Sequence, residues 1–188
     1  PLTVLIDNGE IVRQDIWIEE EESNFLIPSI RDPNMVLVDE GHIIPKRMEF
    51  NKTQSELIYQ SEHASHVLDR IWAIEKLGEK KQRKRSIENA LVHALQKDPF
   101  YGVRVEAAEA LGQYKPKKGA EILISSMARQ DNRVKRACIR SLSSYKTKEV
   151  KDFLIETMMT SDNDYTVNDA YTTLFAVDST AADSLYDW

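Results

Sequence analysis

Apolar residues follow two different periods along this chain, and the change between them comes near residue 50. In "LTVLIDNGEIVRQDIWI" the apolar residues alternate, which is typical of strands, and Asn8-Gly9 predicts a tight hairpin turn with two positive-φ residues. The alternating residues are Leu2, Val4, Ile6, Val12, Ile16 and Ile18. The segments "NFLIPSI" and "NMVLVDEGHIIPKRMEF" predict two or three more strands. So small a sheet buries little by itself, so we expect it to pack on further structure.

From Thr53 onward the apolar residues recur with a period of about 3.6, which predicts helices. A small residue followed four positions later by leucine marks every second helix, and these leucines are 34, 31 and 32 residues apart. The pairs are Ala73 with Leu77, Ala107 with Leu111, Cys138 with Leu142, and Ala170 with Leu174. The segments "RSIENALVHALQ", "GAEILISSMARQ" and "EVKDFLIETMMT" lie between the marker helices and predict a partner helix each. One helix pair cannot bury its apolar face, but stacked pairs share a core.

The sequence therefore predicts a lead-in helix at 53–64 and four helix pairs behind it. The four pairs cover about 66–97, 100–130, 132–161 and 164–188. Asp98, Asp131 and Asp162 precede three marker helices, where a carboxylate suits a turn or an N-cap. The predicted class is α+β and mainly α, with a short antiparallel β-sandwich piece at 1–50 and an α-α superhelix at 51–188.

One helix of this stack resembles a known repeat. "DPFYGVRVEAAEALG" is similar to a HEAT repeat of the short kind found in phycobilin-lyase-like proteins. The matching residues are Asp98, Pro99, Val103, Arg104, Ala107, Ala108, Leu111 and Gly112. The resemblance implies a HEAT-like or ARM-type solenoid whose helices serve stacking.

A second resemblance covers the whole chain loosely and residues 35–78 best. "VLVDEGHIIPKRMEF" followed by "SELIYQSEHASHVLDRIWAIEKLG" resembles the C-terminal region of zinc aminopeptidases of the alanyl aminopeptidase (gluzincin) family. Asp39, Gly41, Lys46 and Phe50 fit the family's Asp-x-Gly turn and following strand, whereas Pro45 departs from its pattern. The resemblance implies that a zinc-binding catalytic domain belongs to the parent protein and that the helices cover its active site.

The chemistry of such a peptidase is absent from this sequence. Zinc aminopeptidases need an HExxH helix with a further Glu ligand, and neither HExxH nor Gly-x-Met-Glu-Asn occurs. His63 and His66, at i and i+3, could share a helix face, but no third ligand is near in sequence. We therefore assign no catalytic, cofactor-binding or metal-binding residue to this chain, and expect zinc only in the missing catalytic domain.

Charge is distributed unevenly and suggests one further candidate. Residues 1–50 carry four Lys/Arg and eleven Asp/Glu, a net charge of −7, whereas the remainder has a net charge of +1. The basic runs "EKKQRKR" at 79–85 and "KPKK" at 115–118 occupy inter-helix turns one repeat apart. They could form a ridge for phosphate or acidic partners, although solvated loops are the simpler interpretation. Aromatic residues for base stacking are not interleaved with them, so nucleic acid is not favoured.

The remaining candidates have structural interpretations. "EEEE" at 19–22 lacks the Gly or Asn of a coordinating loop and indicates a solvated strand end. Cys138 lies on an apolar helix stripe and excludes an intramolecular disulfide, because it is the single cysteine. Phe153, Leu154, Met158 and Met159 are expected in the core. No apolar run approaches the roughly 20 residues of a membrane span.

Three functions stay open from the sequence. The first is a non-catalytic C-terminal fragment of a zinc aminopeptidase, with its own catalytic domain as partner and peptide substrates met indirectly. The second is a HEAT-repeat interaction scaffold without peptidase activity, such as an aminopeptidase-like subunit. The third is a HEAT-repeat lyase or nucleic-acid-binding protein, which the preceding β segment disfavours.

Overall fold

The computed structural model describes residues 2–29, 31–128 and 130–183. The chain forms two compact units, a sheet unit, Pro1–Ala73, and a helical unit, Ile74–Trp188. The boundary falls within one helix, whereas composition changes near residue 50. The domain boundary predicted at residue 50 therefore stays a prediction.

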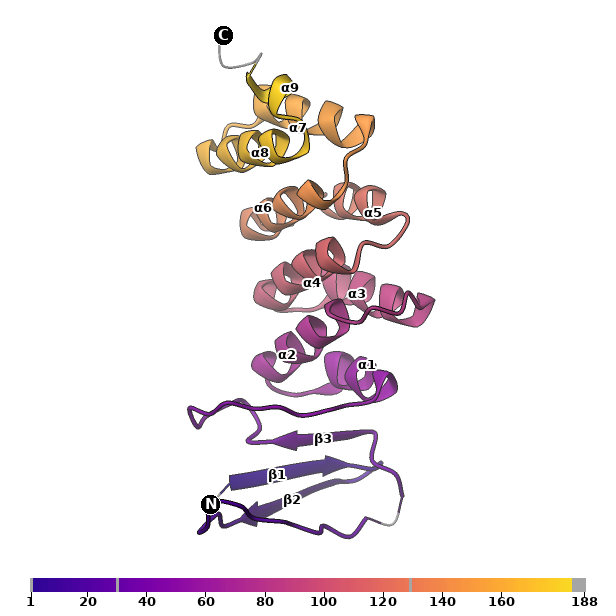
Figure 1. Cartoon of the computed structure of the whole chain (residues 1–188), viewed down its shortest axis with the longest axis vertical. Coiled ribbons are helices and arrows are strands. Elements are labelled where there is room, and N and C mark those ends of the chain that lie inside the picture. Colours follow the sequence, from indigo (N-terminus) through magenta and orange to yellow (C-terminus); the bar gives the residue numbers. More distant parts are fainter. Residues whose placement is uncertain (1, 30, 129, 184–188) are drawn as a thin grey trace. The chain divides into compact units, whose positions relative to one another are not determined.

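The sheet unit contains one antiparallel sheet in the order β2-β1-β3, formed by β1 (Leu2–Asp7), β2 (Ile11–Ile16) and β3 (Met35–Val38) (Figure 1). Leu5 packs on one face with Met35, Leu37 and Ala64, and Tyr59 of α1 (Gln54–His63) lies against that cluster. The other face buries a second cluster. Its members are Val4, Ile6, Ile16, Ile27, Val36 and Val38. The alternation read from the sequence thus sorts residues onto two faces of a sheet.

The hairpin differs from its sequence prediction. Asp7 pairs with Ile11, which leaves a three-residue loop at 8–10, and Gly9 alone in this loop has a positive φ, 104°. The Asp7 carboxylate accepts a hydrogen bond from the Gly9 amide at 3.0 Å, and the Asn8 side chain accepts one from the Glu10 amide at 3.3 Å. These side-chain bonds hold the longer loop, so the two-residue turn was wrong.

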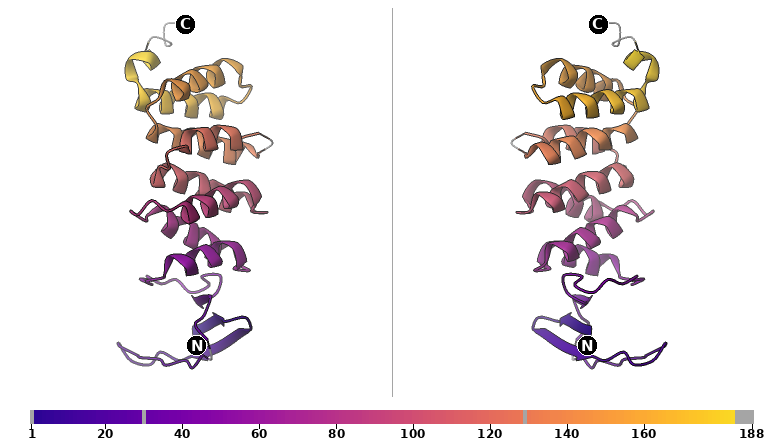
Figure 2. Two further views of the ribbon diagram at one scale, coloured as in Figure 1. Left: turned by 90° about the vertical axis from the view of Figure 1, so that its right-hand side faces the viewer. Right: turned by 90° about the vertical axis from the view of Figure 1, so that its left-hand side faces the viewer.

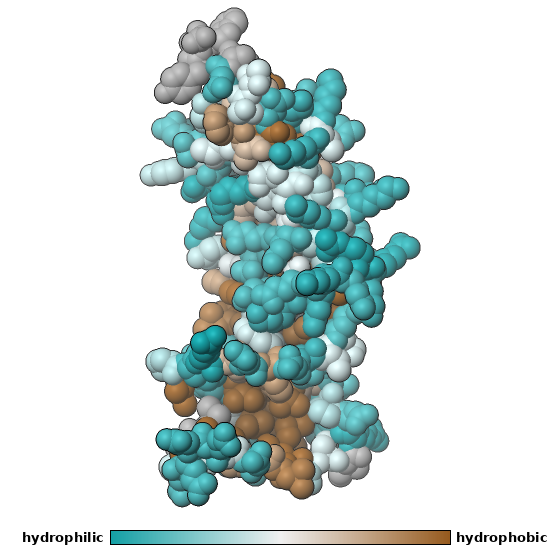
Figure 3. All heavy atoms as spheres, viewed as in Figure 1, coloured by the Kyte–Doolittle hydropathy of each residue, from teal (hydrophilic) through white to brown (hydrophobic). Residues whose placement is uncertain are grey.

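Of the two or three further strands predicted, β3 is the one that forms among the described residues. Residues 24–29 and 43–50 have no strand assignment, so the described residues build one sheet instead of a sandwich. Pro28 and Pro45 each remove a backbone donor, which weakens pairing at these segments. Large apolar side chains accordingly stay exposed in this unit, and hydrophobic residues gather over it in the space-filling view (Figure 3). They include Ile11, Val12, Trp17, Ile18, Phe25, Leu26, Ile43 and Ile44.

Helix pairs follow, and the lead-in helix predicted at 53–64 is confirmed as α1. The helices predicted from the leucine markers are α2 (Val67–Gly78), α4 (Tyr101–Tyr114), α6 (Asn132–Ser141) and α8 (Asp164–Val177), and we call them the marker layer. The partner layer comprises α3 (Arg85–Lys97), α5 (Gly119–Ser126) and α7 (Lys148–Thr160). A short 3-10 turn, η1 (Leu142–Ser144), extends α6, and α9 (Ser179–Asp183) follows α8. Residues 184–188, part of the predicted fourth pair, lie outside the described residues.

Within the helical unit, α4 packs on α6 and α6 on α8 (Figure 2). The partner helices α3 and α7 pack mainly on the marker helices that follow them, α4 and α8, and α5 contacts both α4 and α6. The marker residues lie where the sequence predicts: Ala107, Leu111, Cys138 and Leu174 are fully buried. The caps are only partly as predicted. Asp131 caps α6 by accepting from the Arg133 amide, but Asn163 caps α8 instead of Asp162, and Asp98 forms the turn before α4.

Glycine allows close approach between marker helices. A Cβ on Gly112 of α4 would lie 2.9 Å from the Ser141 Cβ of α6, and one on Gly78 would lie 2.9 Å from the Ala110 Cβ of α4. Such distances are shorter than carbon atoms tolerate. Small residues thus set the spacing of successive repeats at both crossings.

Gly112→Ala should destabilise the helical unit although alanine favours helices by about 1 kcal/mol. The new methyl group must push α6 away, and overpacking of this kind costs about 1–3 kcal/mol. Ser141→Gly should recover part of the loss in the double variant, since it removes the nearest opposing atom. Urea unfolding of the four proteins measures this coupling. Additive free energies for the two substitutions would show that the helices do not meet here.

Candidate interaction surface

Two inter-helix turns of successive repeats lie side by side and line one pocket. The turn at 79–84 joins α2 to α3, and the turn at 115–118 joins α4 to α5. Together with the start of α3 they line an open pocket of about 710 Å³, which we call the basic pocket. Its lining residues are Arg83, Lys84, Arg85, Glu88, Asn89, Tyr114, Lys115, Pro116, Lys117 and Lys118. The two basic runs, 79–85 and 115–118, thus meet in space.

Tyr114 forms the structural link between these turns. Its side chain is 1% exposed, and its hydroxyl accepts a hydrogen bond from the Lys84 amide at 2.5 Å. The same hydroxyl lies 3.0 Å from the Gln82 carbonyl oxygen and 3.2 Å from that of Lys84, to which it can donate. Lys115 then leaves α4 with a φ of 51°, a left-handed conformation that ends the helix. The position of one turn is therefore fixed by a side chain from the other.

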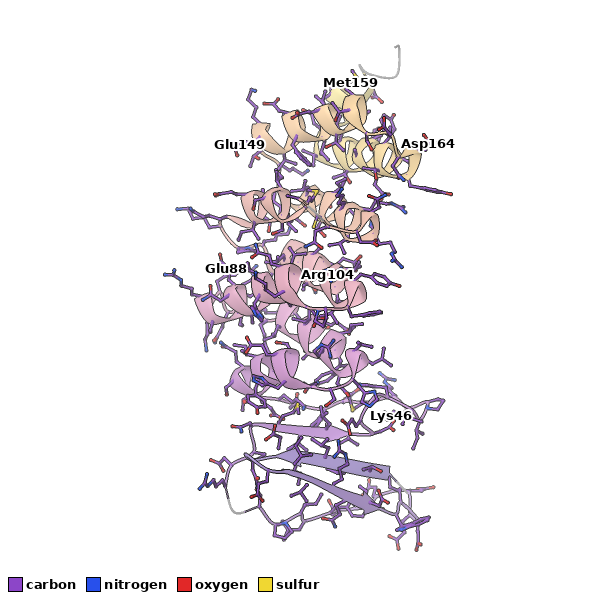
Figure 4. The ribbon with its side chains drawn as sticks, turned by 180° about the vertical axis from the view of Figure 1, so that it is seen from behind. Lys46, Glu88, Arg104, Glu149, Met159 and Asp164 are labelled. Atoms are coloured by element: carbon purple, nitrogen blue, oxygen red, sulfur yellow. The ribbon has the colours of Figure 1, made fainter. Side chains whose placement is uncertain are left out.

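The cationic side chains of the basic pocket face solvent. Arg83 lies over the Tyr114 ring with its guanidinium carbon 4.6 Å from the ring centre. Glu88 of α3 is the single carboxylate in the lining, and nitrogen-tipped side chains project from this edge near it (Figure 4). Among the described residues, these cations form one ion pair, between Lys118 and Glu121 at 3.9 Å, and both of its side chains are over 70% exposed. Exposed pairs at this distance contribute little.

The marker layer, in contrast, has its charges paired between repeats. Arg140 of α6 reaches Glu109 of α4 and Asp169 of α8, both at 3.3 Å. Arg136 lies 2.6 Å from the nearly buried Asp169. Arg104, labelled in Figure 4, donates to the carbonyl oxygens of Asp98 and Pro99 at 2.7 and 3.1 Å. The contacts of Arg136 and Arg140 join neighbouring repeats, whereas those of Arg104 tie the start of α4 to the turn before it.

Glu106 is the exception in the marker layer. Burial, with Glu109 and Glu75 nearby, raises the pKa of its carboxyl to about 7. Like charges and partial desolvation both disfavour the carboxylate. No metal ligand set accompanies it, since the residues that the structure describes contain no group of three or more His, Cys, Asp or Glu able to hold a metal.

The sheet unit has a second polar cluster that the sequence did not predict. Asp69 of α2 accepts from the Gly41 amide at 2.8 Å and lies 3.3 Å from the His42 ring. Burial raises the pKa of the Asp69 carboxyl, and the hydrogen bond from the Gly41 amide and the nearby His42 and His66 lower it by less. Lys52 is buried beside Gln60 at 2.7 Å and Glu56 at 3.1 Å, and burial lowers its pKa. The Asp69 contacts tie the turn at 39–42 to α2, and β3 is tied to α1 because the Val36 amide donates to the Glu56 carboxylate and Lys52 donates to the Val36 carbonyl oxygen.

The pair predicted from "EHASH" is not brought together. His63 ends α1 with its ring stacked on Tyr59 at 4.1 Å, whereas His66 follows the helix and lies against Gly41. The helix ends between the two because Ala64 adopts an extended conformation. The prediction that His63 and His66 could share a helix face was therefore wrong. His66 instead lies in a cluster with His42 and Asp69, which joins residues distant in sequence.

The other sequence candidates are structural or solvated, with one correction. Burial raises the pKa of the Cys138 thiol to about 12, as expected for a core thiol. Glu19, Glu20, Glu21 and Glu22 are all exposed. Met159 was expected in the core but is 67% exposed at the end of α7 (Figure 4), while Leu154 is fully buried. In the described ranges, no helix combines the length and apolar character needed to cross a bilayer.

Comparison with known proteins identifies the helical part. The family described as HEAT repeats matches residues 88–174. The helices form a HEAT-repeat domain. Among solved structures, the chain is similar to one from Nostoc sp. PCC7120, the complex of CpcE and CpcF of phycocyanin lyase, with a TM-score of 0.59. The identity is 22%, and the match covers 78% of this chain and 61% of the lyase chain.

These findings concern the fold. At 22% identity the likeness to the lyase structure shows a shared architecture, and this chain spans 61% of that relative's length. No curated protein gave a significant match. The expected HEAT-like solenoid and the similarity to phycobilin-lyase-type repeats are confirmed, whereas the comparisons give no support to the aminopeptidase resemblance.

Tyr114→Phe should destabilise the helical unit by about 1–3 kcal/mol, because the Lys84 amide loses its acceptor in a partly buried site. Tyr165→Phe is the matched control, since that side chain is 68% exposed. Urea unfolding compares the two variants. Equal and negligible effects would mean that the Tyr114 hydroxyl does not hold the turn.

Glu106→Gln should change how stability depends on pH. The pKa of Glu106 is raised from 4.5 to about 7, so its stabilising contribution is present below pH 4.5 and is lost as pH rises through 7. The glutamine side chain does not ionise, so this loss does not occur in the variant. At pH 8 its free energy of unfolding should be higher than that of the wild type by on the order of 1 kcal/mol after allowance for solvent screening. Thermal melts at pH 4 and pH 8 measure the difference, with Glu156→Gln as an exposed control. An identical difference at both pH values would contradict the burial of Glu106.

Proposed function

We propose that this chain is a non-catalytic HEAT-repeat scaffold that binds another protein. The observation that carries the proposal is the basic pocket, an exposed and preformed surface left after the apolar sides of the helices are used for stacking. Scaffolds of stacked repeats present extended surfaces of this kind to their partners.

The solved structure of similar fold supports a protein partner. It is the complex of two proteins, CpcE and CpcF. A HEAT-repeat fold there associates with a second chain, so we extend the same mode of use to this chain. The absence of a zinc ligand set in the sequence also favours binding over chemistry.

A second candidate keeps the aminopeptidase resemblance. In this case the chain is a C-terminal part of a zinc aminopeptidase, and its helices limit the access of peptides to the active site. The observation that favours it is the turn at 39–41, where Asp39 and Gly41 both have positive φ. Asp39 also forms an ion pair with Lys46, labelled in Figure 4, so the residues that carry the resemblance act together. An HExxH motif with a downstream Glu in the gene before Pro1 would select this candidate.

The scaffold proposal predicts neither peptidase activity nor bound zinc for the isolated chain. Aminoacyl-p-nitroanilide hydrolysis and elemental analysis measure these two properties. One tightly bound zinc per chain, or turnover above background, would refute the proposal.

The positive test is capture of a partner. The tagged chain is incubated with extract from its source cells, crosslinked, and compared with an unrelated bait of equal charge by quantitative mass spectrometry. We expect at least one protein to be enriched and then to form a stoichiometric complex when purified. If no such complex can be reconstituted, the chain is not a scaffold of this kind.

A further inference from the structure

We infer that the basic pocket binds an acidic segment of the partner protein in an extended conformation. This inference rests on the proposed scaffold function and adds the chemistry of the partner. Six cationic side chains, five from the two turns and one, Arg85, from the start of α3, surround the pocket against one carboxylate, Glu88. The cations are Arg83, Lys84, Arg85, Lys115, Lys117 and Lys118.

The pocket is preorganised for such a ligand. The Tyr114 hydroxyl bonds to backbone atoms of the 82–84 turn, and the Arg83 guanidinium rests on the Tyr114 ring. The next tyrosine in the stack, Tyr145, donates to the Leu111 carbonyl oxygen at 3.0 Å, which fixes the end of α4. Both turns are therefore held in place before a ligand arrives, so less ordering entropy is lost on binding.

The size and lining of the pocket favour a peptide over other anions. About 710 Å³ is far more space than one phosphate group fills, and the cations spread over two repeats. Tyr114 is the single aromatic residue of the lining and is buried, so no base can stack on it. The large apolar side chains exposed in the described helical unit are Phe100, Met159, Tyr165 and Phe175, and none lines the pocket. A lipid surface therefore finds no apolar anchor here.

The spacing of the repeats selects the spacing of the acidic residues. Packed helices lie about 8–10 Å apart, so successive turns are separated by a similar distance. A polyproline II chain rises about 3.1 Å per residue with three residues per turn, which places side chains i and i+3 on one side about 9 Å apart. Acidic residues at every third position would thus meet both turns. Arg83 and Arg85 can bind carboxylates through two parallel hydrogen bonds.

The test uses a fluorescein-labelled peptide, (Glu-Pro-Ala)4, and the whole chain. The double variant Arg85→Glu/Lys117→Glu reverses one charge at the start of α3 and one in the turn at 115–118. Its control is Arg47→Glu/Lys97→Glu, which changes net charge equally at exposed positions, with Lys97 at the opposite end of α3 from Arg85. Fluorescence anisotropy should show the pocket variant binding at least about tenfold more weakly and the control within about twofold of the wild type. Thermal melts verify folding, and Arg85→Gln/Lys117→Gln replaces the pocket variant if it unfolds.

Several results would overturn the inference. Equal weakening in both double variants would mean that bulk charge alone attracts the peptide. A peptide of the same composition with its four glutamates adjacent should bind more weakly. Equal or tighter binding of that peptide would contradict the inference that acidic residues are required at every third position. Displacement of the peptide by inorganic phosphate, or by a single-stranded oligonucleotide of equal charge, at lower concentration would assign the pocket to phosphate or nucleic acid. Self-association of the chain that the pocket variant abolishes would make the occupant a second copy.

The capture experiment separates this inference from the scaffold proposal. If a partner binds the pocket variant as tightly as the wild type, the scaffold proposal holds but the pocket is not the binding site. If the pocket binds the acidic peptide specifically but no partner is captured, the inference about the pocket stands and the scaffold proposal fails. We expect instead that the pocket variant loses the captured partner and the control variant retains it.

Discussion

The close approach of successive marker helices is the constraint on which the helical unit depends. At two crossings a glycine faces a small residue: Gly78 faces Ala110, and Gly112 faces Ser141. No side chain larger than a hydrogen fits at these glycines without a shift of a neighbouring helix. Burial of the marker leucines follows from this spacing, because a wider gap would open cavities around Leu111 and Leu142, which are fully buried.

The same spacing places the inter-helix turns next to one another. Tyr114 can bond to the turn at 82–84 because α4 lies close to α2, and Tyr145 reaches Leu111 in the same way one repeat later. Side-chain hydrogen bonds also link the partner layer, where Gln96 donates to Ser126 at 3.1 Å. The position of the basic pocket is thus a consequence of repeat geometry, and its charge comes from the turn sequences.

The repeats were predictable from the sequence, whereas the contacts between turns were not. Leucine spacing sets the register because each helix pair must bury its stripe against the next, and a period can be read without coordinates. The hydrogen bonds of Tyr114 join residues 30 and 32 positions apart, and no local pattern announces such a contact. The cluster at Asp69 was missed for the same reason, since Gly41 lies 28 positions away. The strands expected from "NFLIPSI" and from the segment after Gly41 do not form at 24–29 and 43–50, where a proline interrupts an apolar segment and removes a donor that strand pairing needs.

The net charge of the helical segment gave no indication of the basic pocket. The segment after residue 50 is almost neutral, which favoured solvated loops for both basic runs. The structure separates the charges of the helical unit into two groups. Arg136 and Arg140 are neutralised by Glu109 and Asp169 in the marker layer, where they join repeats. The cations of the basic pocket have no comparable partners among the described residues, and cations held at close spacing repel one another until an anion arrives. A ligand of opposite charge relieves that repulsion as well as gaining its own contacts. A surface of this kind therefore gains more from an acidic segment than the near-zero net charge of residues 51–188 indicates.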